Sequence, residues 1–154
     1  MNDNDTALPP PPPPSSPQPP PPPPPGGADS GQPGDADALT AMWAHIIGAV
    51  LSLICLTAPF GWAPALLIYL FNKDKSRFVA FHSLQALFFF GAIGVANFGL
   101  WVFGMFGLFL LTAPLSLLIN IGGAVYGVFV GIKAKDGLWT EYMVAGELAR
   151  KQLS

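Results

Sequence analysis

The sequence predicts an all-α membrane protein, a polytopic helical bundle of three spans that follows a disordered, proline-rich N-terminal tail. Two long stretches without formal charge, 43–71 and 78–132, predict the bundle, because about 20 apolar residues are enough to cross a bilayer. The tail is predicted by residues 9–25, fourteen of which are proline. We therefore expect three regions: a tail (1–41), a transmembrane domain (42–136) and a cytoplasmic, amphipathic C-terminal segment (137–154).

The proline-rich segment cannot form a regular helix or a sheet ladder, because proline fixes φ and lacks an N–H group. An extended polyproline rod of about 50 Å is expected over 9–25, followed by a flexible acidic linker. A simple spacer explains this composition. The alternative is a ligand for a proline-binding partner, although the tail has no basic residue to orient such a complex.

The first apolar stretch, 43–71, is interrupted by Pro59, Gly61 and Pro64. Taken whole, it is about 43 Å long as a helix, which exceeds one upright span. A single span kinked at the prolines is our first expectation. A re-entrant helical hairpin, which would give four membrane segments in total, is the alternative.

The second stretch is too long for one helix and predicts two spans, at 79–101 and 108–132. Asn97 and three glycines place the turn between them within 97–107. Trp101 in this region is typical of an interfacial anchor.

Basic residues close to both ends of this pair of spans predict which side is cytoplasmic. Two spans return the chain to its starting side, so both basic groups can be cytoplasmic together. They can also contact anionic lipid. A single first span would place the tail outside the cytoplasm, whereas a hairpin would keep it inside. The predicted cytoplasmic anchors are Lys73, Lys75, Arg77, Lys133 and Lys135.

The spans offer little for chemistry. They contain no Asp or Glu, which argues against ion coupling, and the chain has no hydrolase, phosphate-binding or zinc-protease motif. His45 and His82 alone would make a poor metal site, and Cys55 is the single cysteine. The net charge of −2 and the absence of a basic stripe exclude nucleic-acid binding. We expect no enzymatic activity, no catalytic residue, no cofactor and no metal.

Small and polar residues at helical spacing predict a helix-packing face on each span. Gly123, Gly127 and Gly131 form two overlapping GxxxG repeats on the last span. Such faces indicate a compact bundle, self-association or association with other membrane proteins. The predicted packing residues are His45, Ser52, His82, Gln85, Asn120, Gly123, Gly127 and Gly131.

Two motifs resemble a known family. The matching residues are Lys73, Asp74, Ser76, Phe78, Val79, His82, Gln85, Ala86 and Leu87, then Lys133, Ala134, Gly137 and Tyr142, with His45 upstream. This pattern resembles a bacterial membrane family, domain of unknown function 4870, similar in layout to the Tic-twenty-like subunit of the chloroplast import machinery. Two departures are Phe88–Phe90, where that family has an Asn-Phe-Gln run, and Met143, where it has proline.

The resemblance implies a bacterial inner-membrane protein that acts as a non-enzymatic accessory or scaffold subunit, with protein translocation as one possible setting. The alternative function is an oligomeric channel or passive small-solute transporter. A pore would require a continuous polar stripe along a span, and the stripes here are mostly glycine and alanine.

Overall fold

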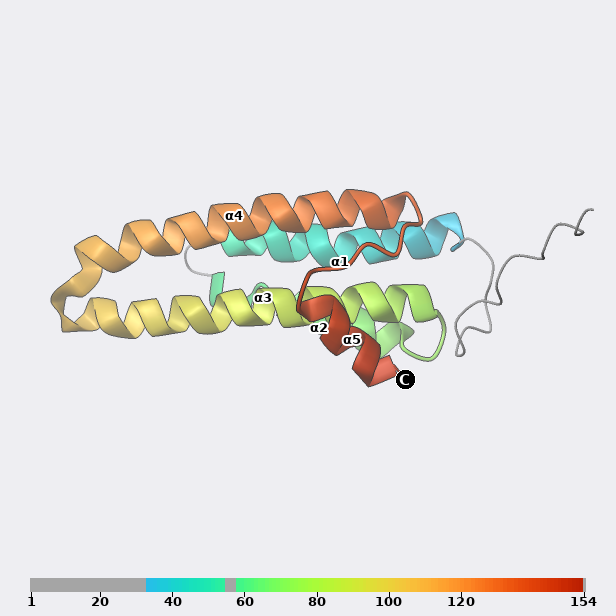
Figure 1. Cartoon of the computed structure of the whole chain (residues 1–154), viewed down its shortest axis with the longest axis horizontal. Coiled ribbons are helices and arrows are strands. Elements are labelled where there is room, and N and C mark those ends of the chain that lie inside the picture. The colour runs from blue at the N-terminus through green and yellow to red at the C-terminus, as the bar shows by residue number, and fades with distance from the viewer. Residues whose placement is uncertain (1–32, 55–57, 154) are drawn as a thin grey trace, which may run out of the picture. The chain divides into compact units, whose positions relative to one another are not determined.

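The computed structural model describes residues 33–54 and 58–153, and every regular element within them is helical. The all-α prediction is therefore confirmed for these residues. Most of the predicted tail lies outside them, and the first helix begins at Asp35, inside the range assigned to the tail. In chain order the elements are α1 (Asp35–Leu53), η1 (Ala58–Phe60), α2 (Ala63–Asn72), α3 (Arg77–Phe103), η2 (Gly104–Leu108), α4 (Phe109–Lys135) and α5 (Ala145–Leu153) (Figure 1).

Helices α1 and α2 form an antiparallel hairpin. Near the start of α1, Asp37 accepts a 2.7 Å hydrogen bond from the hydroxyl of Ser76, which follows α2. At the other end of α1, a methyl group added at Gly48 would lie 2.9 Å from the carbonyl oxygen of Gly61. The chain therefore leaves one end of the bundle along α1 and returns to it along α2. Our expectation of a single kinked helix over 43–71 is therefore wrong. Helices α1 and α2 are arranged as in the alternative, a helical hairpin.

The two prolines determine where this hairpin reverses. Pro59 lies in η1, and Pro64 lies in the first turn of α2, where a missing N–H leaves no intrahelical bond unmade. A methyl group added at Gly94 of α3 would lie 2.8 Å from the Pro59 carbonyl oxygen. Because Gly94 is about 26 Å along α3 from Arg77, the hairpin ends before α3 does.

Helices α3 and α4 form the second, longer hairpin, which Figure 1 shows as two helices side by side. Each has 27 residues, hence a length of about 40 Å. The hydroxyl of Ser76 caps α3 by accepting a 3.4 Å bond from the Val79 amide. The chain reverses in η2, where Gly107 has φ +87°, a conformation that favours glycine.

The three-span count is not confirmed by the helices. Two helical stretches are long and apolar enough to cross a membrane, Asp35–Leu53 and the continuous run Arg77–Lys135. The second of these is the α3–α4 hairpin. The predicted range 79–101 lies within α3, and 108–132 begins at the last residue of η2 and continues within α4. Of the described helices, α2 is too short to be a candidate span.

The glycines of α4 allow the other helices to approach closely. A methyl group at Gly127 would lie 2.7 Å from the ring of Phe90 and 3.5 Å from the Ala49 side chain. At Gly131 it would meet the backbone of Met42 at 3.3 Å. Helix α4 therefore packs on α1 and α3 through one face.

The C-terminal segment folds back onto the bundle. Gly137, with φ +73°, ends α4 in a Schellman motif, in which Leu138 donates to the Lys133 carbonyl and Gly137 to the Ala134 carbonyl. An irregular segment, 138–144, follows, and α5 then packs Ala149 against Phe81 and Leu84 of α3. Helix α5 forms the helical part of the predicted C-terminal amphipathic segment.

Candidate functional site

Two histidines and a tyrosine from distant parts of the sequence form a hydrogen-bonded chain inside the bundle. The hydroxyl of Tyr142 lies 3.0 Å from Nδ1 of His45 in α1. Nε2 of His45 lies 3.3 Å from Nδ1 of His82 in α3, and Nε2 of His82 lies 3.2 Å from the carbonyl oxygen of Leu138. All three side chains are buried. This buried chain of hydrogen bonds, formed by Tyr142, His45 and His82, connects α1, α3 and the segment after α4.

The carbonyl at one end sets the direction of every bond in the buried chain when both rings are neutral. The Leu138 carbonyl can only accept, so Nε2 of His82 carries the proton and Nδ1 of His82 accepts. Nε2 of His45 is therefore the donor to His82, and Nδ1 of His45 accepts from the Tyr142 hydroxyl. Each ring then uses one donor and one acceptor, with no nitrogen left over for a ligand.

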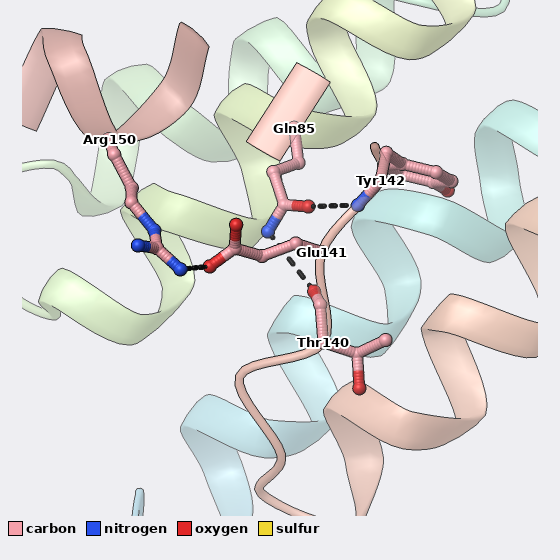
Figure 2. Close-up of polar contacts among 5 residues, drawn as sticks. All are labelled: Gln85, Thr140, Glu141, Tyr142 and Arg150. Atoms are coloured by element: carbon pink, nitrogen blue, oxygen red, sulfur yellow. Dashed lines mark hydrogen bonds and ion pairs between the residues drawn. The ribbon is translucent and has the colours of Figure 1, made fainter. Parts of the chain in front are cut away.

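Gln85, one turn after His82 on α3, fixes the backbone of the same C-terminal segment. Its Oε1 accepts a 2.9 Å bond from the amide of Tyr142, and its Nε2 donates a 3.3 Å bond to the Thr140 carbonyl (Figure 2). Figure 2 also shows the ion pair between Glu141 and Arg150, which ties this segment to α5. His82 and Gln85 thus satisfy backbone groups that have no helical or sheet partner.

Aromatic rings enclose the buried chain. Tyr142 stacks on Phe89 with ring centroids 4.2 Å apart and planes 7° apart, and Tyr126 meets it edge-on at 5.0 Å. Phe78 lies 4.5 Å from His82, and Trp139 packs against Phe78 at 5.1 Å. Burial, with a smaller effect from Tyr126, raises the pKa of the Tyr142 phenol above its ordinary value. The phenol is therefore held as a neutral donor.

The bonded groups of the buried chain hold one another in place. Both nitrogens of each histidine ring are paired, and the Tyr142 hydroxyl donates to His45. Across 33–54 and 58–153, no group of three or more His, Cys, Asp or Glu side chains could hold a metal ion. The site holds segment 138–144 against α1 and α3.

A second polar group lies nearer the closed end of the α3–α4 hairpin, which is the end where the chain reverses in η2. Nδ2 of Asn97 donates 2.9 Å bonds to Oδ1 of Asn120 and to the Ile93 carbonyl. Nδ2 of Asn120 donates in return to Oδ1 of Asn97 at 3.2 Å, and Ser116 donates to the same oxygen. The two carboxamides therefore join α3 to α4 and use up their own donors.

The structure places the predicted packing residues at several different contacts. His45, His82 and Gln85 lie in the site described above, and Asn120 lies in the second polar group. Gly123 faces Ile93 of α3, Gly127 faces both α1 and α3, and Gly131 faces α1. Ser52 is buried, but its hydroxyl donates 2.8 Å to the Ala49 carbonyl of its own helix.

The predicted anchors lie at one end of the bundle. Lys73, Lys75 and Arg77 lie at the junction between α2 and α3, and Lys133 and Lys135 lie in the last turn of α4. These positions meet where Ala41, Phe78 and Ala134 form a shared apolar cluster.

Reasoning from the sequence missed two features of the site. Tyr142 was placed in the amphipathic C-terminal segment and matched the family resemblance, with no partner assigned, and Asn97 was assigned to a turn. The acceptor role of the Leu138 and Thr140 carbonyls carries no side-chain signal, because backbone groups do not appear in a sequence pattern. The available hint for Asn97 was its position on an apolar helix, which calls for a polar partner.

A family model matches residues 36–149, which include His45, His82, Gln85 and Tyr142 as well as Asn97 and Asn120. It describes MamF/MmsF, the magnetosome magnetite crystal formation protein family. This chain belongs to that family. MamF/MmsF proteins are magnetosome membrane proteins involved in crystal formation. No curated protein and no solved structure gives a significant match.

The MamF/MmsF match corrects the resemblance taken from the sequence. The matching family is neither domain of unknown function 4870 nor the Tic-twenty-like group, and protein translocation is not supported. The layout behind that resemblance, a charged loop before an apolar helix, follows from membrane topology itself. Such a layout does not by itself distinguish one small membrane family from another.

Proposed function

We propose that this chain is a membrane-embedded, non-enzymatic accessory protein of magnetite crystal formation that acts as a helical scaffold. The family match over 36–149 carries the proposal. The site supports the scaffold role, because its polar groups are used in holding α1, α3 and the C-terminal segment together. Its partners are membrane lipids and other membrane proteins or further copies of the chain.

The proposed bilayer is that of the magnetosome, as the family description implies, with the cytoplasmic membrane predicted from sequence as the alternative. Cell fractionation with a C-terminally tagged chain separates these two locations. Recovery of the tagged chain in the magnetosome fraction supports the proposal. Recovery in the cytoplasmic membrane alone contradicts the first location.

A deletion experiment tests the role in crystal formation. Removing the gene from a magnetite-forming host and measuring the crystals by electron microscopy is expected to shift their size distribution. Re-expression of the wild-type chain should restore it. Unchanged crystals in the deletion strain would contradict the proposal.

The channel alternative predicts a different result. Purified protein in liposomes would then pass a solute, and Asn120→Leu would abolish the flux by removing the pairing with Asn97. On the scaffold proposal, wild-type liposomes show no solute-selective flux. A partner that co-purifies in mild detergent would support the scaffold directly.

A further inference from the structure

The closed end of the α3–α4 hairpin has an unusually uniform composition. Residues 98–111 read FGLWVFGMFGLFLL and contain no charged, carboxamide or hydroxyl side chain. Several of the side chains are largely exposed, with Leu110 at 91%, Phe106 at 80% and Met105 at 70%. An exposed apolar surface of this extent is typical of contact with another apolar phase.

The backbone at this end also makes its hydrogen bonds within the hairpin. The amide of Gly104 is bonded to carbonyls of the preceding turn, and Thr112 returns its hydroxyl to the Phe109 carbonyl at 3.5 Å. Gly107 then reverses the chain within a single turn, between α3 and α4. Backbone groups in hydrocarbon must be satisfied internally, and a tight helical hairpin meets that requirement better than an open loop.

A cleft of about 770 Å³ lies beside this end, between the hairpin and the region where α1 and η1 stop. Leu53, Phe60, Trp101 and Ala113 are among its lining residues. Asn97, Ser116, Asn120 and Thr112 also line the cleft, but all their side-chain donors are bonded within the protein. The cleft is therefore shaped for an apolar occupant.

The length of the hairpin also indicates an apolar environment for its closed end. Each arm is about 40 Å long, and the hydrocarbon core of a bilayer is about 30 Å thick. The seven Lys and Arg residues of the chain all lie toward the opposite end or in the C-terminal segment. The surplus length therefore belongs at the charged end, which leaves the apolar end inside the bilayer.

We propose that the closed end of the α3–α4 hairpin stays within the bilayer and that the cleft beside it binds phospholipid acyl chains of the leaflet opposite the charged end. The cleft continues the exposed apolar surface of the hairpin, so the lipid that surrounds the hairpin can enter it. This proposal rests on the membrane placement proposed above and is independent of the role in crystal formation.

Fluorescence of Trp101, which lines the cleft, tests the acyl-chain contact. A variant that keeps Trp101 and replaces Trp43, Trp62 and Trp139 with phenylalanine is reconstituted into phosphatidylcholine vesicles with acyl chains brominated near their ends. At least a twofold loss of emission is expected, with little loss from aqueous iodide. Ala113→Phe should fill the cleft and reduce the loss, whereas Ala96→Phe, on an exposed part of α3 outside the cleft, should not. Strong iodide quenching without bromine quenching overturns the proposal.

Thiol labelling, in protein that retains all four tryptophans, tests whether the hairpin end lies within the bilayer. Met105→Cys in a Cys55→Ser background should resist a membrane-impermeant maleimide from both sides of intact vesicles and react after detergent is added. Lys75→Cys, at the charged end, is the control and should react from one side. Labelling of Met105→Cys from the other side would place the hairpin end in water and overturn the proposal.

Two further results would contradict the lipid assignment or the membrane placement. Oxidative cross-linking of Met105→Cys to a second copy, without bromine quenching, would show that protein covers the end and would contradict the lipid assignment. Release of the protein from vesicles by alkaline carbonate would instead refute the membrane placement itself. Neither result depends on crystal size, so failure here and failure of the crystal-forming role are distinguishable.

Discussion

At the scale of single residues, His82 and Gln85 are explained by the backbone groups to which they bond. His82 donates to the Leu138 carbonyl, and Gln85 bonds to Thr140 and Tyr142. An irregular segment cannot satisfy its own backbone groups, so it must be supplied with partners from neighbouring side chains. Polar residues at the start of an apolar helix are therefore no evidence of catalysis.

Replacing His82 with leucine should destabilise the protein by about 1–3 kcal/mol, because the Leu138 carbonyl and Nε2–H of His45 lose their partners. Thermal unfolding followed by circular dichroism in detergent measures the change. Ser83→Ala is the matched control, because the buried Ser83 hydroxyl has no hydrogen-bond partner in the described part of the chain. Equal destabilisation by both substitutions would contradict the role assigned to His82.

Tyr142 predicts a loss of stability in alkali. Burial raises the pKa of its phenol, so the unfolded chain releases this proton near pH 10 while the folded chain retains it. The contribution is fully present below pH 10 and falls by up to about 1.4 kcal/mol per pH unit above it. Unfolding titrations between pH 8 and about 11.5 should show a smaller decline for Tyr142→Phe than for wild type. Parallel declines would contradict this account.

At the scale of elements, the glycines of α4 differ in what surrounds them. A methyl group at Gly127 would lie 2.7 Å from Phe90, whereas nothing lies within 4 Å of one at Gly122. Only the first position requires glycine for close packing, because a larger side chain there pushes helices apart. The GxxxG repeats therefore act within one chain.

Gly127→Ala should destabilise the bundle by about 1–3 kcal/mol, because Phe90 must move. Gly122→Ala, five residues away on the open face, should be neutral or slightly stabilising, since alanine is the better helix former. Chemical unfolding in detergent compares the two. A larger effect at Gly122 would indicate that the open face is the packed one.

Much of the element pattern could be predicted from the sequence, and the reasons for the failures are specific. The sequence predicts two helices over 78–132, where α3 and α4 lie, because an uncharged stretch of that length has few other structures open to it. The hairpin of α1 and α2 was ranked second, because Pro59 and Pro64 are compatible with either a kink or a reversal. The choice depends on tertiary contacts such as Asp37 with Ser76, which no local pattern contains.

At the scale of the whole described bundle, both hairpins open toward the same end. The start of α1, the junction of α2 and α3, and the end of α4 meet there through Asp37, Ser76 and the cluster of Ala41, Phe78 and Ala134. Basic residues near that end favour a cytoplasmic orientation. The start of α1 would then be cytoplasmic as well, and so would the tail that precedes it.

A single cysteine at Ser30, in a Cys55→Ser background, tests this orientation. An impermeant thiol reagent added to isolated, intact magnetosomes, whose outer face is the cytoplasmic one, should label Ser30→Cys without opening the membrane. Lys75→Cys is the matched control, because both positions are expected on the same side. Protection of Ser30→Cys until the membrane is opened, with Lys75→Cys labelled at once, would refute the hairpin orientation.

The docking of Tyr142 also has a consequence for assembly order. Its hydroxyl bonds to His45 of α1, its amide bonds to Gln85 of α3, and its ring stacks on Phe89. Segment 138–144 is synthesised after α1 and α3, so it finds its binding site only once those two helices have come together. In an incompletely assembled copy this segment has no partners and is open to proteolysis, whereas in the folded bundle it is bonded to His82 and Gln85.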